Sequence, residues 1–244
     1  PKLVVHEGDK VKTGSPLFFD KLKPEVKWAS PSSGVVTSIH FGARRIIEKI
    51  EISVEDKKPE SYKSFSSSEL NAADREAVMK NILDACIFPL IRQRPFNKVA
   101  NPNDVPRDIF VSAYNTAPLS VNVSKVIQNN KDQFQAGLTA LSKLTDGSVY
   151  LTSQKPMEFD NVTNVTIEGP HPAGNVGIQI HHIKPINPGE VIWTVNAQHV
   201  ITIGKLFQNG QYDPGCVVSI GGSGSSNPQT VRALTGSSIG SLLK

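Results

Sequence analysis

The chain has 244 residues, of which 38% are hydrophobic and 20% are charged, as in folded soluble domains and unlike disordered segments. Its length suffices for one large domain or two smaller ones, and no apolar run approaches the roughly 18 residues of a membrane span. The net charge of +4 is spread along the chain without an aromatic RNA-binding motif, so we expect no nucleic-acid partner.

Residues 1–60 alternate short apolar runs with Gly, Pro and Ser turn signals, which predicts a small all-β domain. Strands are expected at 35–40 and 46–52. The sequences EGDKVKTGSPL (7–17) and ASPSSGVV (29–36) resemble those of biotinyl/lipoyl-type barrel-sandwich domains.

The hairpin between these two segments carries the modified lysine in the biotinyl/lipoyl family. Here it reads DKLKPEVK and lacks the usual Met-Lys-Met. We therefore expect neither Lys21 nor Lys23 to carry biotin or lipoate, and we interpret the domain as structural.

Residues 61–220 alternate helical and strand patterns, which predicts a Rossmann-like α/β domain with a largely parallel sheet. The serine-rich segment 61–68 is expected to be a linker, and NAAD at 71–74 to start a helix that Pro89 ends. Apolar positions of that helix recur with a 3.6-residue period: Leu70, Val78, Ile82, Leu83, Cys86 and Ile87. The proline-broken stretch 92–108 is expected to be a loop.

The remainder of this domain is predicted to contain four strands and two long helices. The strands are expected at 108–115, 148–153, 164–169 and 216–222, and the helices at 123–147 and 193–210. Gly147 and Gly210 are the expected carboxyl-terminal caps of the helices. Residues 221–244 are expected to begin a further, truncated domain.

Two loops should lie at the carboxyl ends of parallel strands, where such sheets bind ligands: YNTAPLS (114–120) and GPHPAG (169–174). Neither has the G-x-G-x-x-G fingerprint that lets a pyrophosphate approach the backbone. The glycine-rich segment 221–227 follows a strand but lacks the G-K-[ST] of a phosphate-binding loop, and we interpret it as a flexible turn.

The stretch GPHPAGNVGIQIHH (169–182) contains three of the six histidines. His181 and His182 diverge by about 100° on a helix, and no third ligand follows at useful spacing, so no metal site is expected. We interpret the stretch as a strand, a sharp turn and a helix that starts near Pro172. No G-x-S-x-G motif indicates a nucleophile.

The two cysteines, Cys86 and Cys216, form no C-x-x-C motif, so the chain itself offers no zinc or iron–sulfur site. Cys86 falls on an apolar helical pattern and should be packed. A reducing compartment is therefore the default expectation.

Five segments, in this order behind the barrel motif, resemble the NqrA family, a subunit family of the bacterial Na⁺-translocating NADH:quinone reductase. They are RQRPFNKVA (92–100), IFVSAYNTAPLS (109–120), GPHPAGNVGI (169–178), WTVNAQHVITIGKLFQNG (193–210) and NPQTVRALTGSS (227–238). Chains of that family are longer at both ends, so we expect the present chain to be a central fragment.

This resemblance implies a peripheral subunit on the cytoplasmic face of the bacterial inner membrane. Its complex would oxidise NADH, reduce ubiquinone and export Na⁺, with FAD, FMN and a 2Fe–2S centre on other subunits and no cofactor bound by this chain. The family is distantly similar to the flavoprotein subunit of complex I, where a glycine-rich loop holds FMN and NADH. Here the bulky residues Ile87, Phe88, Leu90 and Ile91 stand in the corresponding region, so we expect nucleotide binding to be lost.

Quinone binding needs an apolar slot and one or two hydrogen-bond donors. The expected quinone site comprises Tyr114, Asn115, Thr116 and His171 as polar groups, with Phe96 and Leu119 as walls. Two alternatives remain open: a docking scaffold without a ligand, and a free-standing nucleotide-binding oxidoreductase, whose NADH would quench Trp28 and Trp193.

Overall fold

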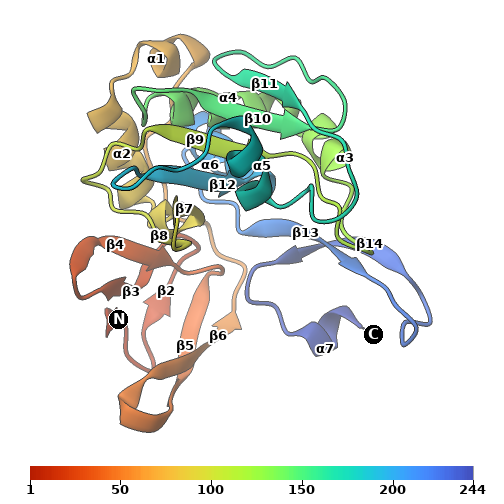
Figure 1. Cartoon of the computed structure of the whole chain (residues 1–244). Helices are drawn as coiled ribbons and strands as arrows, with labels where there is room; N and C mark the ends of the chain where they lie inside the picture. The colour runs from red at the N-terminus through yellow and green to blue at the C-terminus, as the bar shows by residue number, and fades with distance from the viewer. Residues whose placement is uncertain (244) are drawn as a thin grey trace.

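The computed structural model describes residues 1–243 and places a β barrel at the amino end, an α/β layer above it and a β hairpin at the carboxyl end (Figure 1). The strands are β1 (Lys2–Leu3), β2 (Lys10–Val11), β3 (Pro16–Asp20), β4 (Lys23–Ala29), β5 (Gly34–Phe41), β6 (Ile47–Val54), β7 (Ile91–Arg94), β8 (Lys98–Val99), β9 (Asp108–Ser112), β10 (Val149–Ser153), β11 (Thr163–Thr166), β12 (Ile192–Asn196), β13 (Gly215–Ile220) and β14 (Gln229–Leu234). The helices are α1 (Ser67–Ala72), α2 (Arg75–Asp84), α3 (Val123–Gln128), α4 (Lys131–Ser142), α5 (Val176–Ile183), α6 (Ala197–Asn209) and α7 (Ile239–Leu242), with 3-10 turns at Ala43–Arg45 and Phe88–Leu90.

The barrel consists of two antiparallel sheets, β1-β3-β4 and β2-β5-β6. The expected strands at 35–40 and 46–52 are present as β5 and β6. Its own core is small and contains Val5, Val11, Leu17 and Val36. A larger apolar contact joins the barrel to the next layer, because Val26 of β4 is buried in the core of the α/β domain.

The α/β domain is built on one six-stranded sheet in the order β11-β10-β9-β12-β7-β8. The first four of these strands are parallel, as predicted, and β7 and β8 add to the β12 edge in antiparallel fashion. The stretch 92–108, which we predicted to be a loop, is therefore partly strand. Its alternation of apolar and polar side chains outweighs the turn signal of its prolines, because every second residue can be buried.

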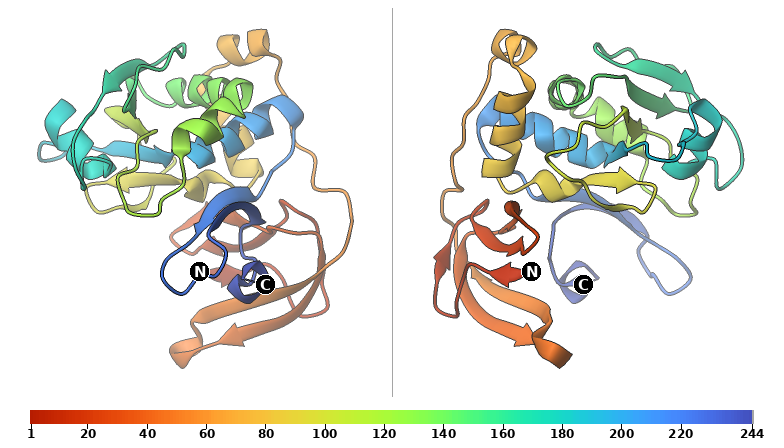
Figure 2. Two further views of the ribbon diagram at one scale, coloured as in Figure 1. Left: turned by 90° about the vertical axis from the view of Figure 1, so that its right-hand side faces the viewer. Right: turned by 60° about the vertical axis from the view of Figure 1, so that its left-hand side comes forward.

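Helices cover both faces of this sheet, and Figure 2 shows the thicker layer, with α4 and α6, on one side and α5 on the other. Alternation along β9 explains the two layers: Ile109 and Val111 enter the main core, whereas Phe110 packs with Ile180 of α5. The two principal helices approach closely at glycines, since a Cβ on Gly204 would lie 1.7 Å from the Gln133 carbonyl oxygen.

The helix predicted at 193–210 begins later than expected. Residues 192–196 form β12, the strand between β9 and β7, and α6 starts after Asn196, whose side chain accepts a hydrogen bond from the Gln198 N–H. Trp193 and Val195 favour a buried strand over the first turn of a helix. The end of the helix is as predicted, because Gly210 adopts a left-handed φ of 64°.

The helix predicted at 123–147 is two helices, since α3 ends at Gln128 and α4 begins at Lys131. Asn129 and Asn130 separate them, and amide side chains compete with the helical hydrogen bonds. The second helix ends at Ser142, before Gly147, so that glycine is not its cap. Gly147 instead leaves room for the Arg107 carbonyl, 1.9 Å from where a Cβ would lie.

Two further helix starts also differ from expectation. Ser66 caps α1 through a capping box with Glu69, and Asp74 caps α2, so residue 71 starts neither helix. Helix α5 begins after Asn175 and not near Pro172. As predicted, the helix before Pro89 ends ahead of that residue.

The strand predicted at 216–222 lies outside the six-stranded sheet. It is β13, and it pairs with β14 in an antiparallel hairpin that α7 follows. Both termini of the described chain lie on the barrel side of the α/β layer (Figure 2). Among residues 1–243, no helix is both long enough and apolar enough to cross a bilayer.

Candidate functional site

The topology creates a crevice at the carboxyl ends of the parallel strands. From β9 the chain builds outward to β10 and β11, and then crosses back to place β12 on the opposite side of β9. The loops after β9 and β12 lead to α3–α4 and α6 on one face of the sheet, whereas the loop after β11 leads to α5 on the other, so a gap opens between them. Parallel α/β sheets bind their ligands at such switch points.

A cavity of about 570 Å³ occupies this position, which is within the usual range for small-molecule sites. We call it the strand-edge cavity. It is lined by Leu90, Arg92, Arg94, Asn97, Ser112, Tyr114, Asn115, Val123, Gly174, Asn175, Val176, Gly177, Ile178, Thr194, Val195, Asn196, Ala197 and His199.

Two arginines supply the charge of the strand-edge cavity. Because β7 alternates, Ile91 and Gln93 are buried while Arg92 and Arg94 share the opposite, cavity-lining face. Burial and the neighbouring Arg92 lower the pKa of the Arg94 guanidinium from its ordinary value. No Asp or Glu is among the lining residues.

His199 lines the same cavity from the first turn of α6. Burial lowers its pKa, because the interior disfavours the charged imidazolium, and a hydrogen bond to the Leu90 backbone opposes this only in part. Burial therefore favours the neutral imidazole of His199, and the arginines are the cationic side chains that line the cavity.

A short hydrogen-bond chain joins the two loops at the rim of the cavity. The Gly174 N–H donates to Thr116 Oγ1 over 3.0 Å, and that hydroxyl lies 3.1 Å from His171 Nδ1. The Tyr114 hydroxyl donates to the Gly169 carbonyl over 3.1 Å. The loops after β9 and β11, although 55 residues apart in sequence, are therefore fixed to one another.

Asn115 is held in an orientation that leaves its amide group available. Its Oδ1 accepts a hydrogen bond from the Ala117 N–H over 3.0 Å, as in an Asx turn. The side-chain NH₂ has no partner among residues 1–243, and Asn115 is one of the residues that line the cavity. This group can donate to a carbonyl oxygen of a ligand.

The six residues expected to form a quinone site are distributed unevenly. Tyr114 and Asn115 line the strand-edge cavity, and Thr116 and His171 lie at its rim. Phe96 is 84% exposed at the β7–β8 turn, and Leu119 is 67% exposed and faces the glycines at 221–222. Neither of these two side chains lines the cavity.

Of the four bulky residues expected to stand where a nucleotide would bind, three lie in the core and one lines the strand-edge cavity. Ile87, Phe88 and Ile91 are fully or almost fully buried in the main core, and Phe88 packs edge-on against Trp193 at 5.8 Å. Only Leu90 lines the cavity. Three of the four side chains therefore do not reach the strand-edge cavity, because the chain at the 3-10 turn directs them into the core.

Several cavity residues were not identified from the sequence: Arg92, Arg94, Asn97, Asn196 and His199. Arg92 and Arg94 were missed because their segment was predicted to be a loop. His199 was missed because it was predicted to lie inside a helix. The alternation I-R-Q-R at 91–94, with two charges on one face, was the available signal.

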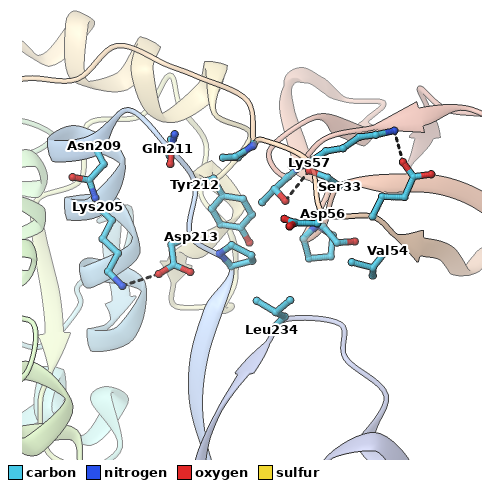
Figure 3. Close-up of a pocket in the computed structure, with 16 residues that line it drawn as sticks. Ser33, Val54, Asp56, Lys57, Lys205, Asn209, Gln211, Tyr212, Asp213 and Leu234 are labelled. Atoms are coloured by element: carbon cyan, nitrogen blue, oxygen red, sulfur yellow. Dashed lines mark hydrogen bonds and ion pairs between the residues drawn. The ribbon is translucent and has the colours of Figure 1, made fainter.

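A second cavity of about 580 Å³ lies where the barrel, the end of α6 and the β13–β14 hairpin meet (Figure 3). Four of its five charged lining groups pair with one another: Lys205 Nζ lies 2.7 Å from Asp213 Oδ2, and Lys57 pairs with Glu55. Tyr212 is half-buried there, and this burial raises its pKa to about 12. Because these charges are satisfied internally, we interpret this cavity as a joint between structural units.

Metal binding has no support in the part of the chain that the structure describes. No group of three or more His, Cys, Asp or Glu side chains in residues 1–243 is arranged to hold an ion. His181 and His182 are both exposed on α5, and their rings are tilted by 78°.

Comparisons with known proteins point to one family. A model of the NqrA N-terminal barrel-sandwich hybrid domain matches residues 1–55, and a model of the NqrA second alpha/beta domain matches residues 73–212. Curated relatives from Marinomonas sp. (strain MWYL1) and Saccharophagus degradans, each named as the A-subunit of a Na(+)-translocating NADH-quinone reductase, are 37% and 38% identical over 100% and 98% of this chain. The chain spans about half the length of these relatives, 55% in both cases.

Proposed function

This chain belongs to the NqrA family, and from that premise we propose that it acts in a peripheral subunit of a Na⁺-translocating NADH-quinone reductase. The name of its relatives supports NADH as electron donor, a quinone as acceptor and Na⁺ as the transported ion. We place this subunit on the cytoplasmic face of the inner membrane, in contact with other subunits that carry FAD, FMN and a 2Fe–2S centre.

The specific contribution that we propose for this chain is quinone binding in the strand-edge cavity. A quinone ring needs apolar walls and donors for its two carbonyl oxygens. Leu90, Val123 and Ile178 supply apolar surface, and the free amide of Asn115 supplies a donor. This unengaged amide beside an apolar wall is the observation on which the proposal depends.

His171 would bind the quinone directly, and Thr116 would position His171. The Thr116 hydroxyl already accepts from the Gly174 N–H, so its proton is free to donate to His171 Nδ1. That arrangement leaves the proton of a neutral His171 on Nε2. We propose Nε2–H as the second donor, at the rim of the cavity.

Titration of the full-length protein with the short-chain quinone ubiquinone-1 tests this function. Saturable binding is expected, and Asn115→Asp should weaken it by roughly fivefold or more, because the variant keeps the acceptor for Ala117 and removes the donor. Asn227→Asp, at an exposed position outside the cavity, introduces the same charge and serves as the control. Equal affinities for both variants would contradict the proposed site.

The alternative function is a docking scaffold without a ligand. The tip of the β5–β6 hairpin favours it, since Phe41, Ile46 and the adjacent Arg44 and Arg45 are exposed there. A scaffold predicts no binding of ubiquinone-1 to the full-length protein, together with intact assembly of the complex. Loss of assembly on Ile46→Asp, without loss of folding, would support this alternative.

We also propose a division of the chain into functional units. The barrel occupies 1–60 and the α/β domain begins at 61, where the linker that leads to α1 starts. We expected a further domain from residue 221, but β13 pairs with β14 across that position. We therefore propose that the last unit begins near Pro214, ahead of the hairpin.

A further inference from the structure

We propose that the strand-edge cavity also binds an anionic group, namely the phosphate of a small soluble molecule, between Arg92, Arg94 and the amino ends of α5 and α6. This goes beyond the proposed quinone function and does not depend on it. A neutral quinone has no negative charge to balance two guanidinium groups, so the paired charge needs a separate explanation.

The first argument is the charge of the cavity. Arg92 and Arg94 lie two residues apart on one strand face, and no carboxylate lines the cavity. Neither arginine forms an ion pair within residues 1–243, whereas Arg107 and Arg232 both do. Two like charges kept together without a counter-charge cost free energy, and a bound anion removes that cost.

The second argument is the hydrogen bonding of the two guanidinium groups. Arg92 donates to the Asn97 carbonyl at one end. The Nε of Arg94 is buried and has no hydrogen-bond partner among the described residues. Buried N–H groups are rarely left unpaired in folded proteins, and a planar guanidinium with free donors is suited to phosphate oxygens.

The third argument comes from the helix ends. The amino ends of α5 and α6 both line the cavity, through Asn175, Val176 and Gly177 on one side and Asn196 and Ala197 on the other. Asn175 does not cap α5 with its side chain, and the Val176 and Gly177 N–H groups have no partner within residues 1–243. Unpaired amides at a helix start, together with the helix dipole, favour an anion.

Gly177 leaves open space at the start of α5. A Cβ at this position would meet no heavy atom within 4 Å, so packing does not require glycine there. Glycine also lowers helix stability relative to alanine. An unoccupied space beside unpaired amides is what close approach of a phosphate to the backbone requires.

Size and wall chemistry indicate what carries the phosphate. A cavity of about 570 Å³ is much larger than one phosphate ion, so the anion should belong to a larger molecule. Leu90, Val123 and Ile178 provide an apolar wall for its remainder. A phosphate ester carries up to two negative charges, matching two arginines, whereas a single carboxylate carries one.

Calorimetric titration of the full-length protein at low salt, with pyrophosphate and AMP as probes and acetate for comparison, tests the proposal. We expect saturable binding of a phosphate probe and none of acetate. Tighter binding of AMP than of pyrophosphate identifies a nucleotide-like ligand, and the reverse order identifies a ligand recognised by its phosphates alone. Absence of saturable binding of both phosphate probes overturns the proposal.

Substitutions assign the binding to this cavity. Arg94→Gln should weaken binding of the phosphate probe about tenfold, and Arg94→Lys by less, because it keeps the charge but loses the planar group. Gly177→Ala should weaken binding several-fold without lowering the melting temperature. Arg44→Gln, in the exposed β5–β6 turn, makes the same charge change as Arg94→Gln and should leave affinity unchanged.

An equal loss of affinity in Arg44→Gln and Arg94→Gln would overturn the proposal, since it would show non-specific attraction to a basic protein. Parallel titration with ubiquinone-1 separates the two functions. Retained phosphate binding without quinone binding refutes only the quinone function. Retained quinone binding without phosphate binding refutes only the present inference.

Discussion

Lys184 Nζ lies 2.8 Å from Asp108 Oδ2, so the carboxyl end of α5 is tied to the first residue of β9. Asp108 is fully buried and also pairs with Arg107 Nε at 2.7 Å. Arg107 in turn donates to the Lys184 and Pro185 carbonyls. This cluster closes the amino edge of the sheet, opposite the edge that contains the strand-edge cavity, and it holds α5 in register on its face of β9.

Replacing Asp108 with Asn should therefore destabilise the fold. Removal of the carboxylate leaves the guanidinium of Arg107 and the ammonium of Lys184 without their buried acceptor, at a cost of roughly 1–3 kcal/mol. Urea unfolding at pH 7 measures this loss. Lys205→Gln removes an ion pair with Asp213 at the second cavity, nearer to solvent, and should cost less.

The same carboxylate predicts the acid dependence. Burial alone would raise the pKa of Asp108, but Lys184, the Ser148 N–H and Arg107 together bring it below its ordinary value. A depressed folded pKa contributes stability above the unfolded pKa of about 4, and that stability is lost as the pH falls through the folded pKa. Wild-type stability should therefore fall below pH 4 more steeply than that of Asp108→Asn, and parallel curves would contradict this role.

The contact between α4 and α6 gives a third prediction, because two glycines let the helices touch. A Cβ on Gly204 would lie 1.7 Å from the Gln133 carbonyl oxygen, and one on Gly137 would lie 2.1 Å from that of Val200. Backbone atoms cannot move aside without separating the helices. Gly204→Ala should lower the free energy of unfolding by roughly 1–3 kcal/mol or more despite the higher helix propensity of alanine.

Gly177→Ala is the matched control for this substitution. It places the same methyl group on a helix where nothing lies within 4 Å, so its stability should stay equal or rise by up to about 1 kcal/mol. Thermal denaturation of both variants gives the comparison. A Gly204→Ala variant as stable as Gly177→Ala would show that the helices are not in direct backbone contact.

The sequence was sufficient for the parts of the fold that depend on local pattern. Period-2 alternation and turn residues identified β5 and β6, and an uninterrupted apolar run identified β9 as a buried parallel strand. The left-handed Gly210 ended α6 where a glycine after a helical pattern should. These features are set by neighbouring residues, which is why one sequence reveals them.

What the sequence concealed depends on contacts between distant segments. Residues 193–196 directly precede a long helix and were predicted to belong to it. They form a strand because β9 and β7 pair with them on either side. Arg92 and Arg94 acquired their place in the cavity only when β7 paired with β12. Tyr114 and Asn115 were identifiable because they directly follow a buried strand. The orientation of the side chains in the 3-10 turn at 88–90, in contrast, depends on tertiary contacts.

A buried amide in α5 connects the elements that carry the cavity and gives the fourth prediction. Gln179 of α5 is almost fully buried; its Oε1 accepts from Thr152 Oγ1 over 2.6 Å, and its Nε2 donates to Ser112 Oγ over 3.0 Å and to the Ala173 carbonyl over 3.1 Å. Gln179→Leu should cost roughly 1–3 kcal/mol, because it leaves buried polar partners unpaired. It should also loosen the loop at 169–174.

Amide hydrogen exchange distinguishes this effect from general destabilisation. Faster exchange in α5 and the loop before it, with unchanged exchange in α4 and α6, is the expected pattern. Gln135→Leu is the control, because Gln135 makes a similar number of hydrogen bonds on the partly exposed surface of α4. Uniformly faster exchange in Gln179→Leu would show that the amide supports the whole domain and not the cavity.

The two cysteines should differ strongly in reactivity, which tests the packing between α2 and the barrel. Cys86 follows α2 in a left-handed conformation, with φ of 57°, and is buried. Burial raises the pKa of its thiol to about 11, and the nearby Lys27 ammonium of β4 offsets this only in part. Because the thiolate is the reactive form, roughly one Cys86 in a thousand is reactive at pH 8. Cys216 on β13 is partly exposed and should react first.

Labelling with a thiol reagent at pH 8 measures this difference. We expect one fast and one very slow cysteine, with the fast phase absent in Cys216→Ser and the slow phase absent in Cys86→Ala. Addition of urea should bring the slow phase to the rate of an exposed thiol, because unfolding removes the burial that suppresses the thiolate. Two fast phases under native conditions would mean that the barrel separates readily from α2, and the contact through Val26 of β4 would then not hold the two layers together.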